Sequence, residues 1–261
     1  MTTQYEIYAL KYGERETKEG QFFFREASQK PLTLHFYIWV ILGGPHPIVV
    51  DTGCTEPDAR LKELRAFVSP AEMLARVRVK AAEVPMTLVS HLHWDHWGGY
   101  PYFPGSRFWI QREELEFWTG VAGQHENYRP FALPESLAQL VLLNYGGRVK
   151  LVTGEAEVLP GIKVHWVGGH TAGLQVVSVP TARGTVVLTS DASHFYRNIE
   201  RRDPVQIITN LPQMLGFRDH RRARRLEGPR GRRPRPGGRH ALRAGRTGDH
   251  QDRVGALRRS R

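Results

Sequence analysis

Cysteine is the scarcest residue of this chain, with Cys54 alone among 261 residues. A single thiol excludes an intramolecular disulfide and fits a reducing compartment, so we expect a cytoplasmic protein. No apolar run approaches the roughly 18 residues of a membrane span, and the longest, 36–42, is typical of a buried strand. The first residues show no basic stretch followed by an apolar one, so no secretory signal is expected.

Lysine and aromatic residues are missing near the end of the chain. Residues 217–261 contain no lysine and, after Phe217, no Phe, Tyr or Trp. This segment holds 16 of the 37 basic residues and four of the 26 acidic ones, a net charge of +12 that leaves −1 for residues 1–216. The overall charge of +11 therefore belongs to the tail and does not indicate a nucleic-acid-binding surface on the rest of the protein.

This composition divides the chain into a folded domain, 1–216, and an Arg/Gly/Pro-rich tail, 217–261. The tail has too few apolar residues to offset the entropy of ordering, so we expect it to be disordered. Sixteen Arg without Lys, beside Gly, Pro and Ala, is also what a shifted reading frame yields in GC-rich coding sequence. A basic arm that binds nucleic acid is the alternative.

The first 216 residues alternate strand-like and helix-like patterns. We expect strands over 33–42, 47–51, 108–110, 148–152, 162–167, 174–179 and 184–189, and helices over 56–67, 70–82, 112–118 and 137–143. Ser69, Pro70 and Glu72 form a typical helix start. Such alternation predicts a layered α/β domain. The irregular, aromatic stretch 119–136 is either a substrate wall or ordinary packing.

Potential metal ligands are concentrated in one short segment, where His91, His93, Asp95 and His96 lie within six residues. Imidazole and carboxylate suit zinc and its first-row neighbours. In an extended segment, alternation would place the first three on one side, and a turn at Gly98 would bring His96 round. The segment therefore offers ligands for two metals, with a solvated histidine-rich loop as the alternative.

Two further candidates follow downstream, His170 in the run 168–173 and Asp191 in the run 189–192. Each run follows a β-prone stretch, so both are expected to be loops at strand ends, where ligands from distant sequence can meet. Either one alone is a weak signal. The ordered set His-x-His-x-Asp-His, Gly-His-Thr and Ser-Asp-Ala predicts one metal centre.

With this ordered set, and an earlier Val-Val-Asp-Thr-Gly strand-turn at 49–53, the chain resembles the metallo-β-lactamase superfamily over about residues 5–216. The resemblance implies an α/β (α+β) fold, a four-layer αββα sandwich whose C-terminal unit is incomplete here. It also implies two zinc ions, with Fe, Mn or Co as alternatives. The ligands it implies are His91, His93 and His170 for the first metal, Asp95 and His96 for the second, and Asp191 for both. It also implies that Asp51 orients one of these ligands.

Within that superfamily the chain is similar to the N-acyl homoserine lactonases, on the stretches 34–37, 95–99, 103–104, 111–115 and 190–193. This resemblance implies quorum quenching: a metal-bridging hydroxide opens the lactone ring, and Asp95 can shuttle a proton to the leaving oxygen. The family has a Tyr three residues after the bridging Asp. This chain has His194 there and Tyr196 two residues later, and either is expected to contact substrate.

The superfamily usually supplies one more histidine to the second metal. His240 is the nearest candidate, whereas His220 comes early and His250 late. The expected partner is a small lactone or ester, with no membrane and with nucleic acid only through the tail. Alternatives are a thioesterase of the glyoxalase II type, another lactonase, a mononuclear iron enzyme using the histidines of the first site or Asp191, and an inactive protein with a nucleic-acid-binding tail.

Overall fold

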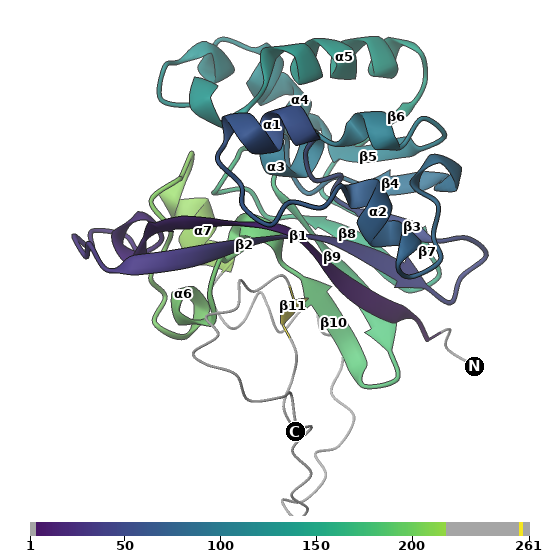
Figure 1. The fold of residues 1–261 in the computed structure, drawn as a ribbon, viewed down its shortest axis with the longest axis horizontal. Helices are drawn as coiled ribbons and strands as arrows, with labels where there is room; N and C mark the ends of the chain where they lie inside the picture. Colours follow the sequence, from purple (N-terminus) through teal and green to yellow (C-terminus); the bar gives the residue numbers. More distant parts are fainter. Residues whose placement is uncertain (1–3, 218–255, 258–261) are drawn as a thin grey trace, which may run out of the picture.

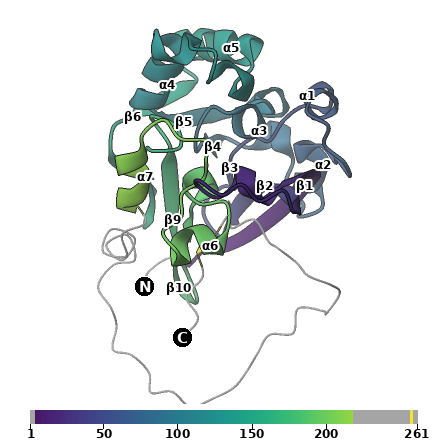
Figure 2. The same ribbon diagram turned by 90° about the vertical axis from the view of Figure 1, so that its left-hand side faces the viewer.

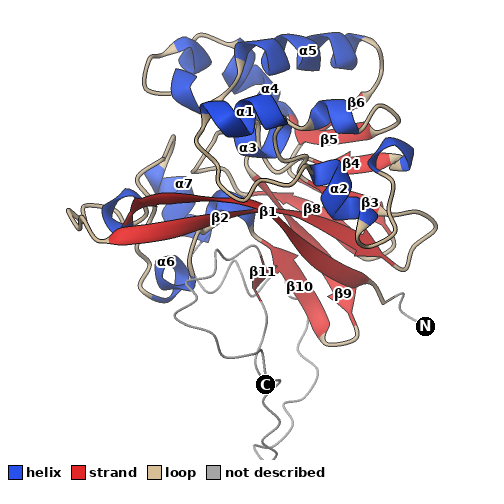
Figure 3. Ribbon diagram, in the orientation of Figure 1, coloured by secondary structure: helices blue, strands red, loops and turns tan. Residues whose placement is uncertain are grey.

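The computed structural model describes residues 4–217 and 256–257. Two β-sheets pack face to face, and helices cover the outer face of the larger sheet (Figures 1 and 3). This arrangement agrees with the layered sandwich that the resemblance implied. Within the described ranges, no helix has both the length and the apolar character needed to cross a membrane.

The larger sheet has six strands in chain order: β1 (Glu6–Lys18), β2 (Pro31–Leu42), β3 (Ile48–Val50), β4 (Met86–Leu88), β5 (Arg107–Gln111) and β6 (Val149–Val152). The first three strands are antiparallel, and β3 to β6 are parallel. Sequence patterning missed β1, because this edge strand carries many charged residues instead of a continuous apolar run.

The smaller sheet is an antiparallel meander with the order β11-β10-β9-β8-β7. Its strands are β7 (Glu155–Leu159), β8 (Ile162–Trp166), β9 (Gln175–Thr181), β10 (Gly184–Leu188) and β11 (Ala256–Leu257). The last of these lies in the tail and pairs with β10, although no strand was expected there. The rest of the tail after Phe217 lies outside the described residues, and so do His220, His240 and His250.

The helices before β6 lie on the larger sheet, the helix at 196–200 lies beside the end of the β1–β2 hairpin (Figures 1 and 2), and the helix at 211–217 packs against the loop at Gly169. They are α1 (Glu56–Leu61), α2 (Pro70–Ala75), α3 (Trp94–Trp97), α4 (Arg112–Thr119), α5 (Pro134–Tyr145), α6 (Tyr196–Glu200) and α7 (Leu211–Phe217). Short 3₁₀ turns lie in the connections between strands and helices: η1 (Glu19–Gln21), η2 (Ala81–Glu83), η3 (Tyr100–Tyr102), η4 (Ala122–Gln124), η5 (Arg129–Phe131) and η6 (Ser190–Ala192).

Two helices are shorter than the periodicity predicted. Glu63, which follows α1, has left-handed backbone with φ of 57°. Arg78, which follows α2, also has left-handed backbone, with φ of 60°. A right-handed helix cannot continue through such residues. The predicted helix start before α2 is present, since Ser69 and Glu72 cap each other's backbone N–H groups at 3.3 and 3.1 Å.

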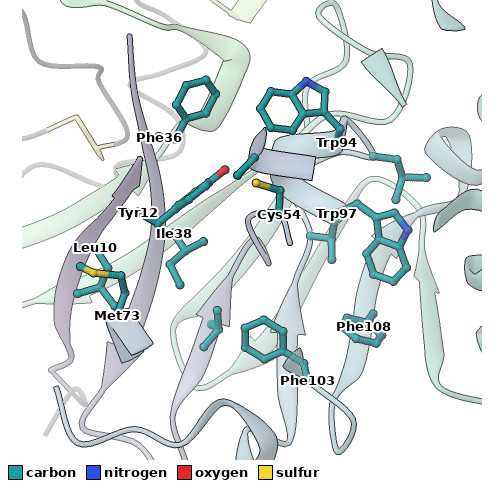
Figure 4. Packing of buried hydrophobic residues seen from close by; sticks show 14 of the residues in the cluster. Leu10, Tyr12, Phe36, Ile38, Cys54, Met73, Trp94, Trp97, Phe103 and Phe108 are labelled. Atoms are coloured by element: carbon teal, nitrogen blue, oxygen red, sulfur yellow. The ribbon is translucent and has the colours of Figure 1, made fainter. Parts of the chain in front are cut away.

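The second half of β2, residues 38–41, is buried on both faces, which accounts for its uninterrupted apolar sequence. Phe36 and Ile38 pack toward the helices with Trp97 and Phe108 (Figure 4). Trp39 and Ile41, on the opposite face of the strand, form the core between the sheets with residues of β8, β9 and β10. With both faces covered, the sheets leave their strand ends as the place for polar chemistry.

Candidate metal centre

The candidate ligands are brought together at the ends of four strands. The segment with His91 and His93 follows β4, His170 follows β8, and Asp191 follows β10. Asp51 comes directly after β3, which pairs in parallel with β4. Because these strands end at one edge of the two packed sheets, residues as far as 100 positions apart meet there, as Ser90 and Ser190 do at 2.8 Å.

The local conformation of the first motif differs from the expected extended segment. His93 is the N-cap of α3, so Asp95 and His96 lie on a short helix and not on an alternating strand. The helical turn separates the motif into two pairs, and the Tyr12 hydroxyl supports it by donating to the Asp95 carbonyl oxygen at 2.7 Å. The division of ligands between two positions therefore arises from a helix start, not from strand alternation.

The first ligand group consists of three imidazoles and one carboxylate, whose ligand atoms all lie within 4.8 Å of one another: His91, His93, His170 and Asp191. The His170 Nε2 atom is 3.0 Å from His93 Nδ1 and 3.4 Å from Asp191 Oδ2. Two ligands of a tetrahedral zinc ion are about 3.4 Å apart at ordinary bond lengths. The observed separations therefore suit one metal ion.

A second group shares Asp191 with the first and adds Asp95 and His96. The His96 Nε2 atom lies 3.4 Å from Asp95 Oδ2 and 3.6 Å from Asp191 Oδ1. The two carboxylate oxygens of Asp191 thus face different groups, Oδ2 the first and Oδ1 the second. This orientation is what a carboxylate shared by two metal ions requires.

Hydrogen bonds hold two of the imidazoles with a nitrogen directed at the centre. Nδ1 of His170 donates to the Ile207 carbonyl oxygen at 2.8 Å, which leaves the lone pair on Nε2. Nδ1 of His96 lies 2.8 Å from Asp51 Oδ2 and donates to it in the same way. Such partners fix the ring orientation and tautomer of metal-binding histidines.

Two buried nitrogen atoms of the centre indicate whether a metal ion fits there. Nε2 of His91 and Nε2 of His96 have no hydrogen-bond partner within the described part of the chain. Leaving buried polar atoms unsatisfied is costly, so such atoms call for an explanation. Both point toward Asp191, at 3.9 and 3.6 Å, where a cation would bond to nitrogen and carboxylate together. The donor set therefore fits metal ions at both positions.

The three histidines of the first ligand group are held in the neutral form, which is the form that binds metals. Burial, followed by the neighbouring imidazoles, lowers the pKa of His91 and of His93 well below the ordinary value. Burial lowers the pKa of His170 to about 4. At neutral pH these side chains therefore need no deprotonation before they bind a cation.

His96 differs because carboxylates surround it. Burial alone lowers its pKa, but the charges of Asp95, Asp51 and Asp191 together outweigh burial and raise the pKa well above the ordinary value. This half of the centre therefore favours positive charge, which a metal ion supplies.

Asp51 connects the ligands to the larger sheet. Its carboxylate accepts from the Ser90 N–H at 2.7 Å and from the Ser90 hydroxyl at 2.9 Å, in addition to His96. Both Asp51 and Ser190 have left-handed backbone, with φ of 64° and 44°. Such conformations cost free energy in residues other than glycine and are frequent at functional sites. The sequence signal for Asp51 was the strand-turn motif, whereas Ser90 had none.

The two residues expected to contact substrate have different environments. His194 is buried, and its Nε2 atom lies 3.1 Å from Asp191 Oδ2. Tyr196 is the first residue of α6 and is 44% exposed. The geometry places His194 at the centre itself, and the role of either residue remains a prediction.

A cavity of about 350 Å³ opens beside the first ligand group, with His93 and His170 in its lining. Trp118, Tyr128 and Phe131 form one wall, and Ile207 and Ile208 are part of the other. The irregular segment 119–136 therefore lines a cavity next to the centre, which favours the substrate-wall interpretation over ordinary packing. The second wall, 206–209, gave no sequence signal.

Cys54 is not among the ligands. Its side chain is fully buried in the helix-side core, near the Tyr12 hydroxyl (Figure 4). Burial, followed by the charges of Asp95 and Asp58, raises the pKa of the thiol. A buried, protonated thiol is a packing residue and not a nucleophile.

Comparisons with known proteins bear on this centre. The sequence model of the metallo-beta-lactamase superfamily matches residues 36–259. The N-acyl homoserine lactonase of Bacillus cereus is 32% identical over 188 residues, which are 66% of this chain and 70% of that protein. The N-acyl homoserine lactonase AiiA of Bacillus thuringiensis subsp. kurstaki is 30% identical over 190 residues, covering 67% and 70%.

Solved structures show a similar fold. An N-acyl homoserine lactone hydrolase with the product N-hexanoyl-L-homoserine at its catalytic metal center superposes with a TM-score of 0.72 at 23% identity, covering 87% of this chain and 89% of that one. The dizinc quorum-quenching lactonase AidC gives a TM-score of 0.68 at 16% identity, with 84% and 82% covered. At these identities the structural likeness concerns the fold alone.

Proposed function

This chain belongs to the metallo-β-lactamase superfamily, and we propose that it is a lactonase with two metal ions that opens the ring of N-acyl homoserine lactones. The observation that carries the proposal is the double role of Asp191, whose two oxygens face two separate ligand groups. Curated relatives with that activity, about 30% identical, support it. Membership of this family makes the chain a metal-dependent hydrolase.

In this proposal His91, His93 and His170 hold the first metal, Asp95 and His96 hold the second, and Asp191 binds both. We propose zinc, because imidazole and carboxylate ligands at tetrahedral spacing suit it, although Fe, Mn or Co accept the same donors. When bound, such a metal pair polarises a carbonyl oxygen and lowers the pKa of a coordinated water toward ~7, which supplies a nucleophile at neutral pH.

The side chains of the centre have separate tasks in ring opening. We propose that His194, whose Nε2 atom lies 3.1 Å from Asp191 Oδ2, contacts the lactone from the position at which the family has a tyrosine. Asp95 takes the proton released by the attacking water and delivers it to the ring oxygen as the C–O bond breaks. Tyr196, at the exposed start of α6, is the second candidate to contact substrate.

The cavity beside the centre supports an acyl substrate over a peptide-derived thioester. Its lining combines aromatic and aliphatic side chains with the uncharged polar Asn127, Gln206 and Thr209, and its described residues include no lysine or arginine. A glutathione thioester carries free carboxylates that such walls would not neutralise, whereas an alkyl chain gains from burial against them. The cavity therefore favours a lactone with an apolar acyl chain over the glyoxalase II type of substrate.

Metal content and turnover, measured together on the purified full chain, test the proposal. We expect two metal equivalents per chain and acid release from N-decanoyl homoserine lactone, followed by a pH indicator. S-lactoylglutathione is the matched control, and its thioester should react slowly. Thioester turnover without lactone turnover would identify the chain as a thioesterase. Absence of bound metal would contradict the assignment as a metal-dependent hydrolase.

A further inference from the structure

The centre contains a buried carboxylate that is not a ligand. Glu114, on α4, is fully buried and lies between the two segments that carry the first ligand group. One segment holds His91 and His93, and the other begins at His170. Burying a carboxylate costs free energy unless several donors satisfy it.

Glu114 accepts a hydrogen bond from each of these segments. The Leu92 N–H, between the two histidines, donates to Oε1 at 2.9 Å. The Gly173 N–H, three residues after His170, donates to Oε2 at 2.7 Å. One carboxylate thus connects two loops that are 59 and 22 residues away from it in the sequence.

A third donor connects Glu114 to the cavity. The Trp118 indole N–H donates to Oε1 at 2.8 Å, and its ring lies 5.7 Å from the His93 ring in an edge-to-face arrangement. The same carboxylate therefore holds a ligand loop and the aromatic wall beside that ligand.

Gly173 shows how closely the second loop approaches α4. A Cβ atom at Gly173 would lie 2.2 Å from the Glu114 backbone nitrogen and 2.3 Å from its Cβ. No side chain fits in that space. The close approach of the loop to α4 therefore depends on two residues, a glycine in the loop and a glutamate on the helix.

We infer that Glu114 is a positioning residue for the first metal site, which it assembles by joining the His91–His93 loop to the His170 loop. It acts through the hydrogen bonds that it accepts from Leu92 and Gly173. At their bases the loops are also joined by the Gln175 N–H, which donates to the Ser90 carbonyl at 2.9 Å. Glu114 sets the separation of the loop tips, where the ligands lie. The inference rests on the metal centre of the proposed function and is independent of its substrate.

The variant Glu114→Gln separates the two connections. A carboxylate accepts through both oxygens, but an amide accepts through one and donates through the other. If the glutamine oxygen accepts from Leu92 and Trp118, the glutamine NH₂ group faces the Gly173 N–H. Two donors then face each other, and the hydrogen bond from Gly173 is lost. We expect the affinity for zinc in the metal-free protein to fall at least roughly tenfold, as for other partners that support metal ligands.

The readout is zinc affinity by chelator competition, paired with the rise in Tm on adding zinc. Ser106→Ala is the matched control, because it removes a buried hydroxyl bonded to the Val84 carbonyl oxygen at 2.7 Å, at the opposite end of the sheet. It should lower Tm with and without zinc alike. Glu114→Gln should also shrink the zinc-induced rise, since that rise depends on affinity.

The outcomes are distinguishable. If wild type binds no zinc, the proposed function fails first; if wild type binds and Glu114→Gln binds within twofold of it, the positioning role is wrong. If that variant does not fold, amide exchange in the metal-free wild type decides. Slow exchange at both Leu92 and Gly173 would support the role, and rapid exchange at Gly173 would overturn it.

Discussion

Nδ1 of His96 lies 2.8 Å from Oδ2 of Asp51, and this pair determines which nitrogen of His96 is available to a metal. The residues are 45 positions apart, and each follows a strand of the larger sheet. Because Nδ1 donates to the carboxylate, Nε2 faces Asp95 and Asp191.

Asp51→Asn should therefore weaken the second metal site. An amide NH₂ toward Nδ1 would favour the tautomer with its proton on Nε2, and the flipped amide would face the Ser90 N–H with a donor. We expect a loss of roughly 10–100-fold in affinity for the second metal, measured by stepwise zinc titration. Asp203→Asn, which alters a carboxylate that accepts from the Phe24 N–H at 3.1 Å, is the control. Equal titrations for both variants would contradict this role.

Substitution of single ligands should distinguish shared from separate ligands. His93→Ala removes a ligand of the first group alone, whereas Asp191→Ala removes one from both. We expect the histidine variant to lose about one metal equivalent and the aspartate variant two. Turnover should fall at least roughly 10³-fold in each, since a metal contributes several kcal/mol. Elemental analysis beside the lactone assay checks this, with the exposed Glu116→Gln as control; near wild-type turnover in either ligand variant would refute the assignment.

The cavity predicts a dependence on acyl-chain length. Phe131→Ala removes part of one wall, so it should lower kcat/KM for a decanoyl lactone by about 10–200-fold, the range for lost apolar contact in a pocket. The Phe131 ring lies 5.2 Å from the His93 ring, and a butanoyl chain buries fewer methylene groups against it, so the butanoyl lactone should lose less. Val121→Ala, at a side chain 86% exposed in the same segment, is the control. A uniform loss at all chain lengths would place the acyl chain elsewhere.

Cys54 should be inert in the folded protein. Because burial raises the pKa of the thiol, it stays protonated through neutral pH and above, and only the thiolate reacts. Alkylation by iodoacetamide at pH 8 should be at least roughly tenfold slower than in urea-unfolded chain, since each unit of pKa changes the thiolate fraction about tenfold. Equal rates in the native and unfolded protein would show that the thiol is exposed.

Removal of residues 218–261 tests the predicted boundary. All six proposed ligands and the cavity lie before residue 210, and of the described strands the deletion removes only the two-residue β11, so the shortened chain should keep most of its activity. Loss of one metal equivalent together with activity would implicate a histidine of the tail. Salt-dependent DNA binding by the full chain that disappears on truncation would instead support a basic arm.

Much of the centre was predictable because its motifs are short and each follows an apolar strand. The order of the ligand motifs, the strand at 33–42 and the helix start at Ser69 all depend on neighbours within a few residues, where side-chain type and backbone geometry are directly linked. The ends of the helices at 56–67 and 70–82 were wrong, because left-handed residues stop them and periodicity does not detect these.

Local sequence therefore specifies which ligand types are present, where strands begin and end, and that the tail differs from the rest of the chain. Only the tertiary structure decides which oxygen of Asp191 faces which group, that Ile207 holds His170, and that Glu114 joins the two loops. The physical reason is distance along the chain. These contacts join residues 21 to 95 positions apart, and they exist only once two sheets have packed and brought their strand ends to one edge.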